Sequence, residues 1–108
     1  MAERAERRRN PRVELRVPAV LRIGEQTLTG ESVNLSYSGV LIGSLDALPE
    51  AGASCEITLR LPAGEVRGVG KVTRLIPSEN RCAVDILRVD ENGQLLLVTL
   101  LIAGATAD

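Results

Sequence analysis

Residues 13–23 read VELRVPAVLRI, and this stretch decides the class of fold. Apolar residues stand at every second position from Val13 to Ile23, and Glu14 and Arg22 are among the residues between them. A period of two over this length is typical of a β-strand with one buried face. Pro18 cannot donate a ladder hydrogen bond, so we expect an edge position or a bulge at that residue.

Shorter strands follow, each bounded by a turn signal. We expect them near residues 27–33, 40–42, 55–61, 65–76 and 82–86. Gly68 and Gly70 interrupt one of them, where strong bending or close approach of another backbone is expected. Six short strands with turn signals predict a mainly β fold, a six-stranded antiparallel β-barrel, formed with a C-terminal α-helix over residues 13–103.

The helix is expected near the end of the chain. Asp90 can cap it, and residues 95–103 are dense in helix formers, so we expect residues 104–108 to form a tail. Apolar residues lie around almost the whole circumference of this expected helix, whereas a helix packed on one side normally carries a single apolar stripe. Either the helix is covered on all sides, or it meets a partner chain, for example in a homodimer.

Length and composition indicate one small cytoplasmic domain. The chain has 108 residues with one Tyr, no Phe and no Trp, so its core must be aliphatic. We find no signal-peptide pattern, and the longest apolar run is too short to span or insert into a membrane. Cys55 and Cys82 stand on apolar strand faces and are interpreted as buried core thiols.

Charge is distributed unevenly along the chain. Residues 1–22 hold seven Arg and three Glu, whereas the remainder holds six basic and eleven acidic residues. Pro11 disfavours helical geometry before it, so we interpret residues 1–12 as a flexible arginine-rich arm, called the arginine arm below. A basic arm on an acidic body predicts that the arm meets an anion.

The residue types needed for common catalytic sites are missing. There is no His, which removes the usual general base. The sequence has no phosphate-binding Walker loop, no dinucleotide-binding glycine fingerprint and no cluster of metal ligands. We therefore predict a binding protein and not an enzyme, with no catalytic residue, metal site or cofactor.

The first candidate binding motif is an RxxxR pattern in the arginine arm. Arg8 and Arg12 stand four residues apart on a segment that can close around an anion from two sides. Guanidinium groups bind phosphate bidentately, stack on bases and match the O6 and N7 edge of guanine. Alone, this pattern is more typical of a solvated basic tail.

The second motif is an NxSxxG pattern, Asn-Leu-Ser-Tyr-Ser-Gly, at residues 34–39. Asn34 and Ser36 face the same side if the chain is extended there. The Asn34 side chain can donate to and accept from a base edge, and Ser36 can bind phosphate or base. Gly39 permits a turn that other residues would strain. Alone, this pattern also fits an ordinary β-turn.

Together, the two motifs resemble the PilZ domain family. RxxxR precedes the first strand, NxSxxG follows the second, and the likeness extends over about residues 7–103. The resemblance implies binding of the bacterial second messenger cyclic di-GMP. Arg8 and Arg12 would hold phosphates and guanine, Asn34 and Ser36 would contact guanine, and Gly39 would shape the turn. By the same resemblance, Arg7 and Arg9 would be auxiliary ligand contacts.

With no second domain in these residues, a cyclic di-GMP receptor would relay its signal to an unidentified downstream protein. Two alternatives stand beside this function. The first is a PilZ-fold interaction module that does not bind nucleotide. The second is a nucleic-acid binder that uses the basic arm, against which the acidic body and the missing aromatic residues argue.

Overall fold

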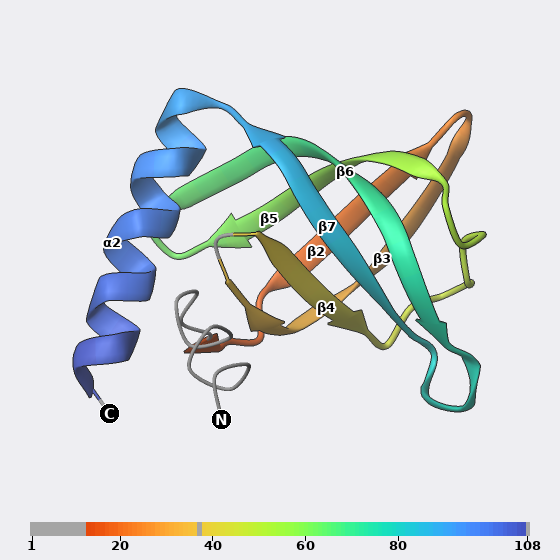
Figure 1. The fold of residues 1–108 in the computed structure, drawn as a ribbon, viewed down its shortest axis with the longest axis horizontal. Helices are drawn as coiled ribbons and strands as arrows, with labels where there is room; N and C mark the ends of the chain where they lie inside the picture. The colour runs from red at the N-terminus through yellow and green to blue at the C-terminus, as the bar shows by residue number, and fades with distance from the viewer. Residues whose placement is uncertain (1–12, 37, 108) are drawn as a thin grey trace, which may run out of the picture.

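The computed structural model describes residues 13–36 and 38–107, with side chains of the C-terminal helix described through residue 102. Seven strands, one 3-10 turn and one helix make up this part of the chain (Figure 1). Their bounds are β1 Val13–Glu14, β2 Pro18–Ile23, β3 Gln26–Leu35, β4 Gly39–Gly43, β5 Ser54–Leu61, β6 Gly64–Ile76, η1 Pro77–Glu79, β7 Arg81–Val89 and α2 Glu91–Ala107.

The strands close into a barrel. Six of them pair side by side in the order β3-β2-β5-β6-β7-β4, and β4 pairs again with β3. Every pairing is antiparallel, and the short β1 adds two residues alongside β3. Closure leaves no open sheet edge in the barrel. The predicted six-stranded antiparallel barrel with a C-terminal helix is confirmed.

The stretch at residues 13–23 forms two strands, β1 and β2, instead of one. Both pair with β3, and Pro18 begins the second, as the expected irregularity at this residue indicated. In the gap, the Ser32 N–H donates to the Val17 carbonyl oxygen at 2.9 Å. The Ser32 hydroxyl accepts from the Val17 N–H at 3.0 Å and donates to the Leu15 carbonyl oxygen. Ser32 therefore holds the interrupted strand to β3.

The core is aliphatic, as predicted from the composition. It also contains both cysteines, which are free and buried. Desolvation by burial raises the pKa of Cys55, and raises the pKa of Cys82 to about 11 with a smaller contribution from Cys55. The interpretation as core thiols is confirmed. The core residues are Val17, Ala19, Leu21, Leu28, Leu35, Val40, Ile42, Leu45, Cys55, Ile57, Leu59, Leu61, Val66, Val72, Cys82, Val84 and Leu97.

The predicted close approach at the β6 glycines is also confirmed. A Cβ atom on Gly70 would lie 2.5 Å from the Asp85 carbonyl oxygen, and one on Gly68 would collide with the Arg88 carbonyl oxygen. The register between β6 and β7 shifts beside Gly70, and this shift leaves Leu87 as an unpaired extra residue in β7. Its side chain is 68% exposed. Such a bulge bends the strand and increases its local twist.

Helix α2 begins as predicted and ends later. The Asp90 carboxylate accepts a hydrogen bond from the Gly93 N–H at 3.0 Å, which caps the first turn. The helical backbone continues to Ala107, so the tail predicted at residues 104–108 is corrected to helix as far as residue 107. No proline follows residue 103, and Gly104 alone weakens a helix by only about 1 kcal/mol.

Helix α2 lies beside one end of the barrel and contacts β6 and β1 (Figure 1). Leu97 and Leu101 are buried, whereas Leu95 is 65% exposed and Ile102 is 61% exposed. The interpretation of a helix covered on all sides is therefore wrong, because its apolar surface exceeds what one side of the barrel can cover. Within the described residues, no helix is long and apolar enough to cross a membrane.

Candidate ligand-binding site

The NxSxxG motif forms the tight connection between β3 and β4. Asn34 is the penultimate residue of β3, and Gly39 is the first residue of β4. The Ser36 N–H donates to the Gly39 carbonyl oxygen at 2.9 Å, and the Ser36 hydroxyl donates to the same oxygen at 3.3 Å. Ser36 is only 6% exposed. Part of this serine's role is therefore to hold the turn closed.

Strand β7 supports the same turn from the neighbouring side. The Ile86 N–H donates to the Ser38 carbonyl oxygen at 2.9 Å, and Gly39 stands opposite Asp85 in the ladder. A Cβ atom on Gly39 would lie 3.1 Å from the Val84 carbonyl oxygen, which is tighter than ordinary contact. Glycine fits here because the turn lies close against β7, and a Cβ atom would require β7 or the turn to shift by a few tenths of an ångström.

A row of four residues crosses the barrel next to this turn. Asn34 of β3 pairs with Leu41 of β4, Leu41 pairs with Ala83 of β7, and Ala83 pairs with Arg74 of β6. Residues directly opposite one another in a sheet project from the same face. Their sequence neighbours Leu35, Val40 and Val84 are buried in the core, so the row projects from the outer face.

This row and the turn enclose a pocket of about 160 Å³. Three predicted ligand residues, Asn34, Ser36 and Gly39, line it together. The other lining residues are Ser38, Val40, Leu41, Arg74, Ala83, Val84 and Asp85. Sequence reasoning missed Ser38, Arg74 and Asp85. Ser38 lies inside the motif, whereas the two charged residues carry no sequence signal and reach the pocket only through the strand register.

The pocket carries one group of each charge among its described lining residues. Arg74 and Asp85 are both exposed. Neither forms an ion pair or a side-chain hydrogen bond with any residue that the structure describes. Both side chains are therefore available to a ligand.

The predicted arginines at positions 7, 8, 9 and 12 lie outside the described residues. The point at which the chain enters the barrel is described. Val13 pairs with Leu35, which directly precedes Ser36. Val13, the residue that follows Arg12 in the sequence, therefore lies beside the start of the NxSxxG turn.

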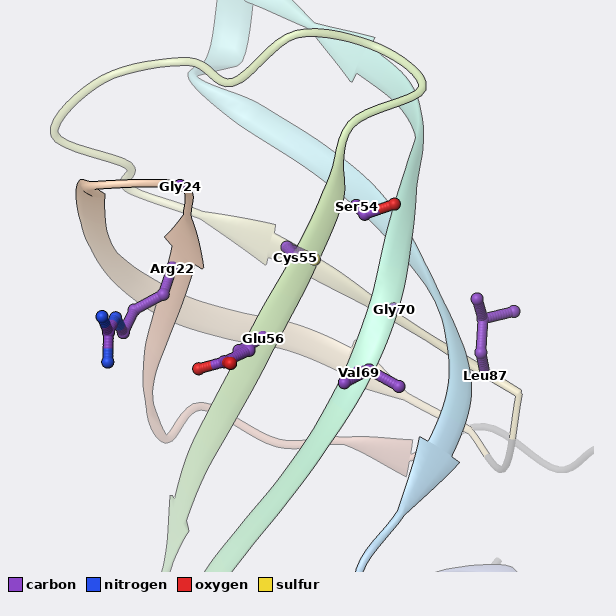
Figure 2. Close-up of a pocket in the computed structure, with 8 residues that line it drawn as sticks. All are labelled: Arg22, Gly24, Ser54, Cys55, Glu56, Val69, Gly70 and Leu87. Carbon is purple, nitrogen blue, oxygen red and sulfur yellow. The ribbon is translucent and has the colours of Figure 1, made fainter.

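A larger pocket of about 470 Å³ lies over β2, β5, β6 and β7 (Figure 2). It contains none of the predicted ligand residues. Arg22 and Glu56, which are cross-strand partners, extend from its β2 and β5 side, and Leu87 stands on β7 at the other side (Figure 2). The larger pocket holds neither motif, whereas the smaller pocket at the turn is lined by the three fixed residues of NxSxxG. Across the described part of the chain, no three potential metal ligands gather into a site.

Comparison with solved structures identifies similar folds. The inhibitor of motility MotI (DgrA) of Bacillus subtilis is 19% identical with a TM-score of 0.78, over 94% of this chain and 52% of that one. The PilZ domain of YcgR from Escherichia coli, solved with c-di-GMP, is 16% identical with a TM-score of 0.72, over 94% and 93%. The PilZ domain of CeSA from a cellulose-synthesizing bacterium is 17% identical with a TM-score of 0.66, over 85% and 95%.

This chain spans about half the length of the Bacillus motility inhibitor. A search of curated protein sequences gave no match. The model of one protein family, the PilZ domain, matches residues 6–103, which is most of the chain and includes both motifs. The chain therefore belongs to the PilZ domain family.

Proposed function

We propose that this PilZ domain binds cyclic di-GMP in the pocket at the NxSxxG turn. The observation that carries the proposal is the meeting of Asn34, Ser36 and Gly39 in one pocket, next to the strand that leads from the RxxxR motif. A similar barrel, that of YcgR from Escherichia coli, was solved with c-di-GMP and supports the choice of ligand.

The proposed roles follow from the chemistry of each side chain. Arg8 and Arg12 hold phosphates and guanine, because a guanidinium binds phosphate bidentately and matches the O6 and N7 edge of guanine. Asn34 and Ser36 contact guanine through side chains that both donate and accept. Gly39 allows the turn to lie against β7.

Arg7 and Arg9 are proposed as auxiliary contacts. An arginine at position 7 can stack on a second guanine and thereby admit a second ligand molecule. Calorimetric stoichiometry tests this role, because an Arg7→Ala variant with an unchanged two-ligand stoichiometry would contradict it.

We propose a receptor that acts in the cytoplasm through another protein. Cyclic di-GMP gathers the arginine arm onto the barrel, and the ordered arm offers a new surface to a downstream protein. Fixing the backbone of each arm residue costs roughly 1–2 kcal/mol of conformational entropy. The free energy gained from phosphate and guanine contacts must exceed this loss. No catalytic step belongs to this proposal.

Self-association through α2 is a separate proposal. Leu95 and Ile102 are seven residues apart, which places both on one face of the helix, and both are more than half exposed. Exposed apolar residues on one helix face favour contact with a second apolar surface, and an identical helix supplies one in a homodimer.

Isothermal titration tests the binding function. We expect the wild type to bind cyclic di-GMP, and the Arg8→Ala/Arg12→Ala and Ser36→Ala variants to bind at least about tenfold more weakly. Arg22→Ala/Arg88→Ala is the matched control, because it removes two exposed arginines that do not line the turn pocket.

Parallel titrations separate the alternative functions. Titrations with GTP and with a short nucleic acid should show no comparable binding. A wild type that fails to bind cyclic di-GMP at tens of micromolar, roughly −6 kcal/mol, contradicts the proposal and favours a nucleotide-independent interaction module. Preferential binding of nucleic acid would instead support the nucleic-acid alternative.

A further inference from the structure

The carboxylate of Asp85 lines the proposed ligand pocket, where its negative charge does not favour the binding of phosphate groups. Asp85 stands opposite Gly39 in the β4–β7 ladder, and a Cβ atom on Gly39 would lie 3.9 Å from the Asp85 Oδ1 atom. The carboxylate therefore borders the side of the turn that glycine leaves open. A negative charge next to a dianionic ligand opposes binding unless it contacts a part of the ligand that carries hydrogen-bond donors.

Guanine offers such donors. Its Watson–Crick edge presents N1–H and the N2 amino group side by side, and an ionised carboxylate is an acceptor with two oxygens. Adenine presents an unprotonated N1 at the corresponding position, which would face the carboxylate with a lone pair. Asp85 therefore has the right chemistry to accept guanine and to reject adenine.

Arg74 and Asp85 carry opposite charges, and both are neighbours of the small side chain of Ala83 on the outer face of the barrel. Asp85 and Ala83 are two residues apart on β7, so both project from the same face at a spacing of about 7 Å along the strand. Arg74 pairs with Ala83 from β6 and projects beside it. A guanidinium donates only, and it matches the O6 and N7 acceptors on the Hoogsteen edge of guanine.

We propose that Asp85 and Arg74 determine the specificity of this pocket for guanine, with Asp85 accepting from N1–H and N2 and Arg74 donating to O6 or N7. Both side chains line the pocket with no side-chain partner among the described residues. The proposal rests on the cyclic di-GMP function and adds two residues outside the RxxxR and NxSxxG motifs.

The decisive experiment removes one donor from the ligand and one acceptor from the protein. Cyclic di-GMP is compared with the cyclic dinucleotide that carries hypoxanthine, which lacks the N2 amino group, and with cyclic di-AMP. We expect the wild type to prefer cyclic di-GMP over the hypoxanthine analogue by about tenfold, within the discrimination typical of paired base contacts. In Asp85→Ala the preference should fall to about twofold or less.

Asp85→Asn and Glu25→Ala provide the comparisons. Asp85→Asn keeps one acceptor oxygen and the side-chain shape, so it should retain part of the preference. Glu25→Ala removes an exposed acidic residue that does not line the pocket, so it should leave the preference unchanged. If Asp85 only repels the ligand, Asp85→Ala would strengthen binding of all three dinucleotides equally, and the proposal is overturned.

Arg74 is tested in the same way. Arg74→Ala should weaken cyclic di-GMP binding by about tenfold, and Arg74→Lys should restore little, because an ammonium lacks the planar fork. Arg88→Ala is the matched control on β7. Wild-type protein that binds no cyclic di-GMP refutes the proposed function together with this inference. Wild-type binding with an unaltered preference in Asp85→Ala refutes the specificity role alone.

Discussion

The Ser32 hydroxyl accepts a hydrogen bond from the Val17 N–H at 3.0 Å, in the gap between β1 and β2. The same hydroxyl donates to the Leu15 carbonyl oxygen, so one side chain serves two backbone groups that lack a regular ladder there. Ser32 is fully buried, and Val17 is 5% exposed. This contact holds the strand that leads from the arginine arm to the turn pocket.

Replacing Ser32 tests that connection. Ser32→Ala leaves the Val17 N–H without its side-chain acceptor, and we expect a loss of about 1–3 kcal/mol in the free energy of unfolding, measured by urea denaturation. Weaker attachment of β1 should also lower affinity for cyclic di-GMP. Ser54→Ala, on an exposed position of β5, should change stability by less than about 0.5 kcal/mol. Equal stability of the two variants would show that the bridge is dispensable.

The close approach of β6 and β7 predicts intolerance of a methyl group at Gly70. Gly70→Ala would place a Cβ atom 2.5 Å from the Asp85 carbonyl oxygen, so we expect destabilisation of about 1–3 kcal/mol in urea. Gly24→Ala is the comparison. The new Cβ atom at position 24 would meet nothing within 4 Å, so this variant bears only the backbone strain of an alanine at a φ of +62°. That strain amounts to about 1–2 kcal/mol. A Gly70→Ala variant as stable as the wild type would contradict the tight packing.

A larger side chain at Ala83 should block the ligand pocket. Ala83 is partly exposed and lies between Leu41 and Arg74 in the outer row. Ala83→Leu would fill much of a pocket of about 160 Å³, so affinity for cyclic di-GMP should fall at least about tenfold while the fold is retained. Ala47→Leu adds the same bulk in an exposed loop and should bind normally. Unchanged affinity in Ala83→Leu would place the ligand elsewhere.

The buried thiol of Cys82 should make stability depend on alkaline pH. Burial raises its pKa from 9.0 to about 11, so between these values the folded state keeps a proton that the unfolded state has lost. The protonated thiol therefore stabilises the folded state fully below about pH 9. This contribution to the free energy of unfolding is lost as the pH rises toward 11, and the total loss is of the order of 2–3 kcal/mol.

The difference in unfolding free energy between wild type and Cys82→Ala isolates this effect from other alkaline titrations. Cys82→Ala leaves a small cavity and is less stable at neutral pH, but its deficit should shrink between pH 9 and 11. A deficit that stays constant across this range would mean that the Cys82 thiol does not titrate as described.

The exposed face of α2 predicts self-association. Light scattering behind gel filtration should give twice the mass of one 11.5 kDa chain for the wild type at high concentration. Leu95→Lys should give a monomer, since it puts a charge into the proposed apolar contact. Leu87→Lys is the matched control, because Leu87 is equally exposed but lies on β7. A wild type that remains monomeric at all concentrations would contradict the homodimer.

Much of the fold could be predicted from local patterns. Alternation along residues 13–23 indicated a half-buried strand, and Val17, Ala19 and Leu21 are indeed buried. An irregularity at Pro18 was expected as well, and the strand is interrupted just before this residue, but the bridging of the gap by Ser32 was not expected. This bridging depends on β3 lying opposite the gap between β1 and β2, and no local sequence pattern reveals that arrangement.

The candidate site likewise contains some residues that the local sequence predicts and others that only the pairing of distant strands brings there. The spacing of Asn34, Ser36 and Gly39 predicted a shared turn because the three residues are close in sequence. Arg74 and Asp85 stand about 40 to 50 residues further along the chain and reach the pocket only because β7 pairs with β4 and β6 pairs with β7. The helix end was also mispredicted, because helical propensity alone did not determine where α2 stops.

By itself, the sequence determined which faces of the strands are buried, which thiols enter the core, where glycine is needed and which two motifs flank the first strands. These properties depend on side-chain type and on a period of two or of 3.6, both of which are local. The tertiary structure alone decided that Arg74 and Asp85 border the turn and that α2 is covered on one side. Register and barrel closure depend on contacts between distant strands, whose packing is settled only when the whole barrel forms.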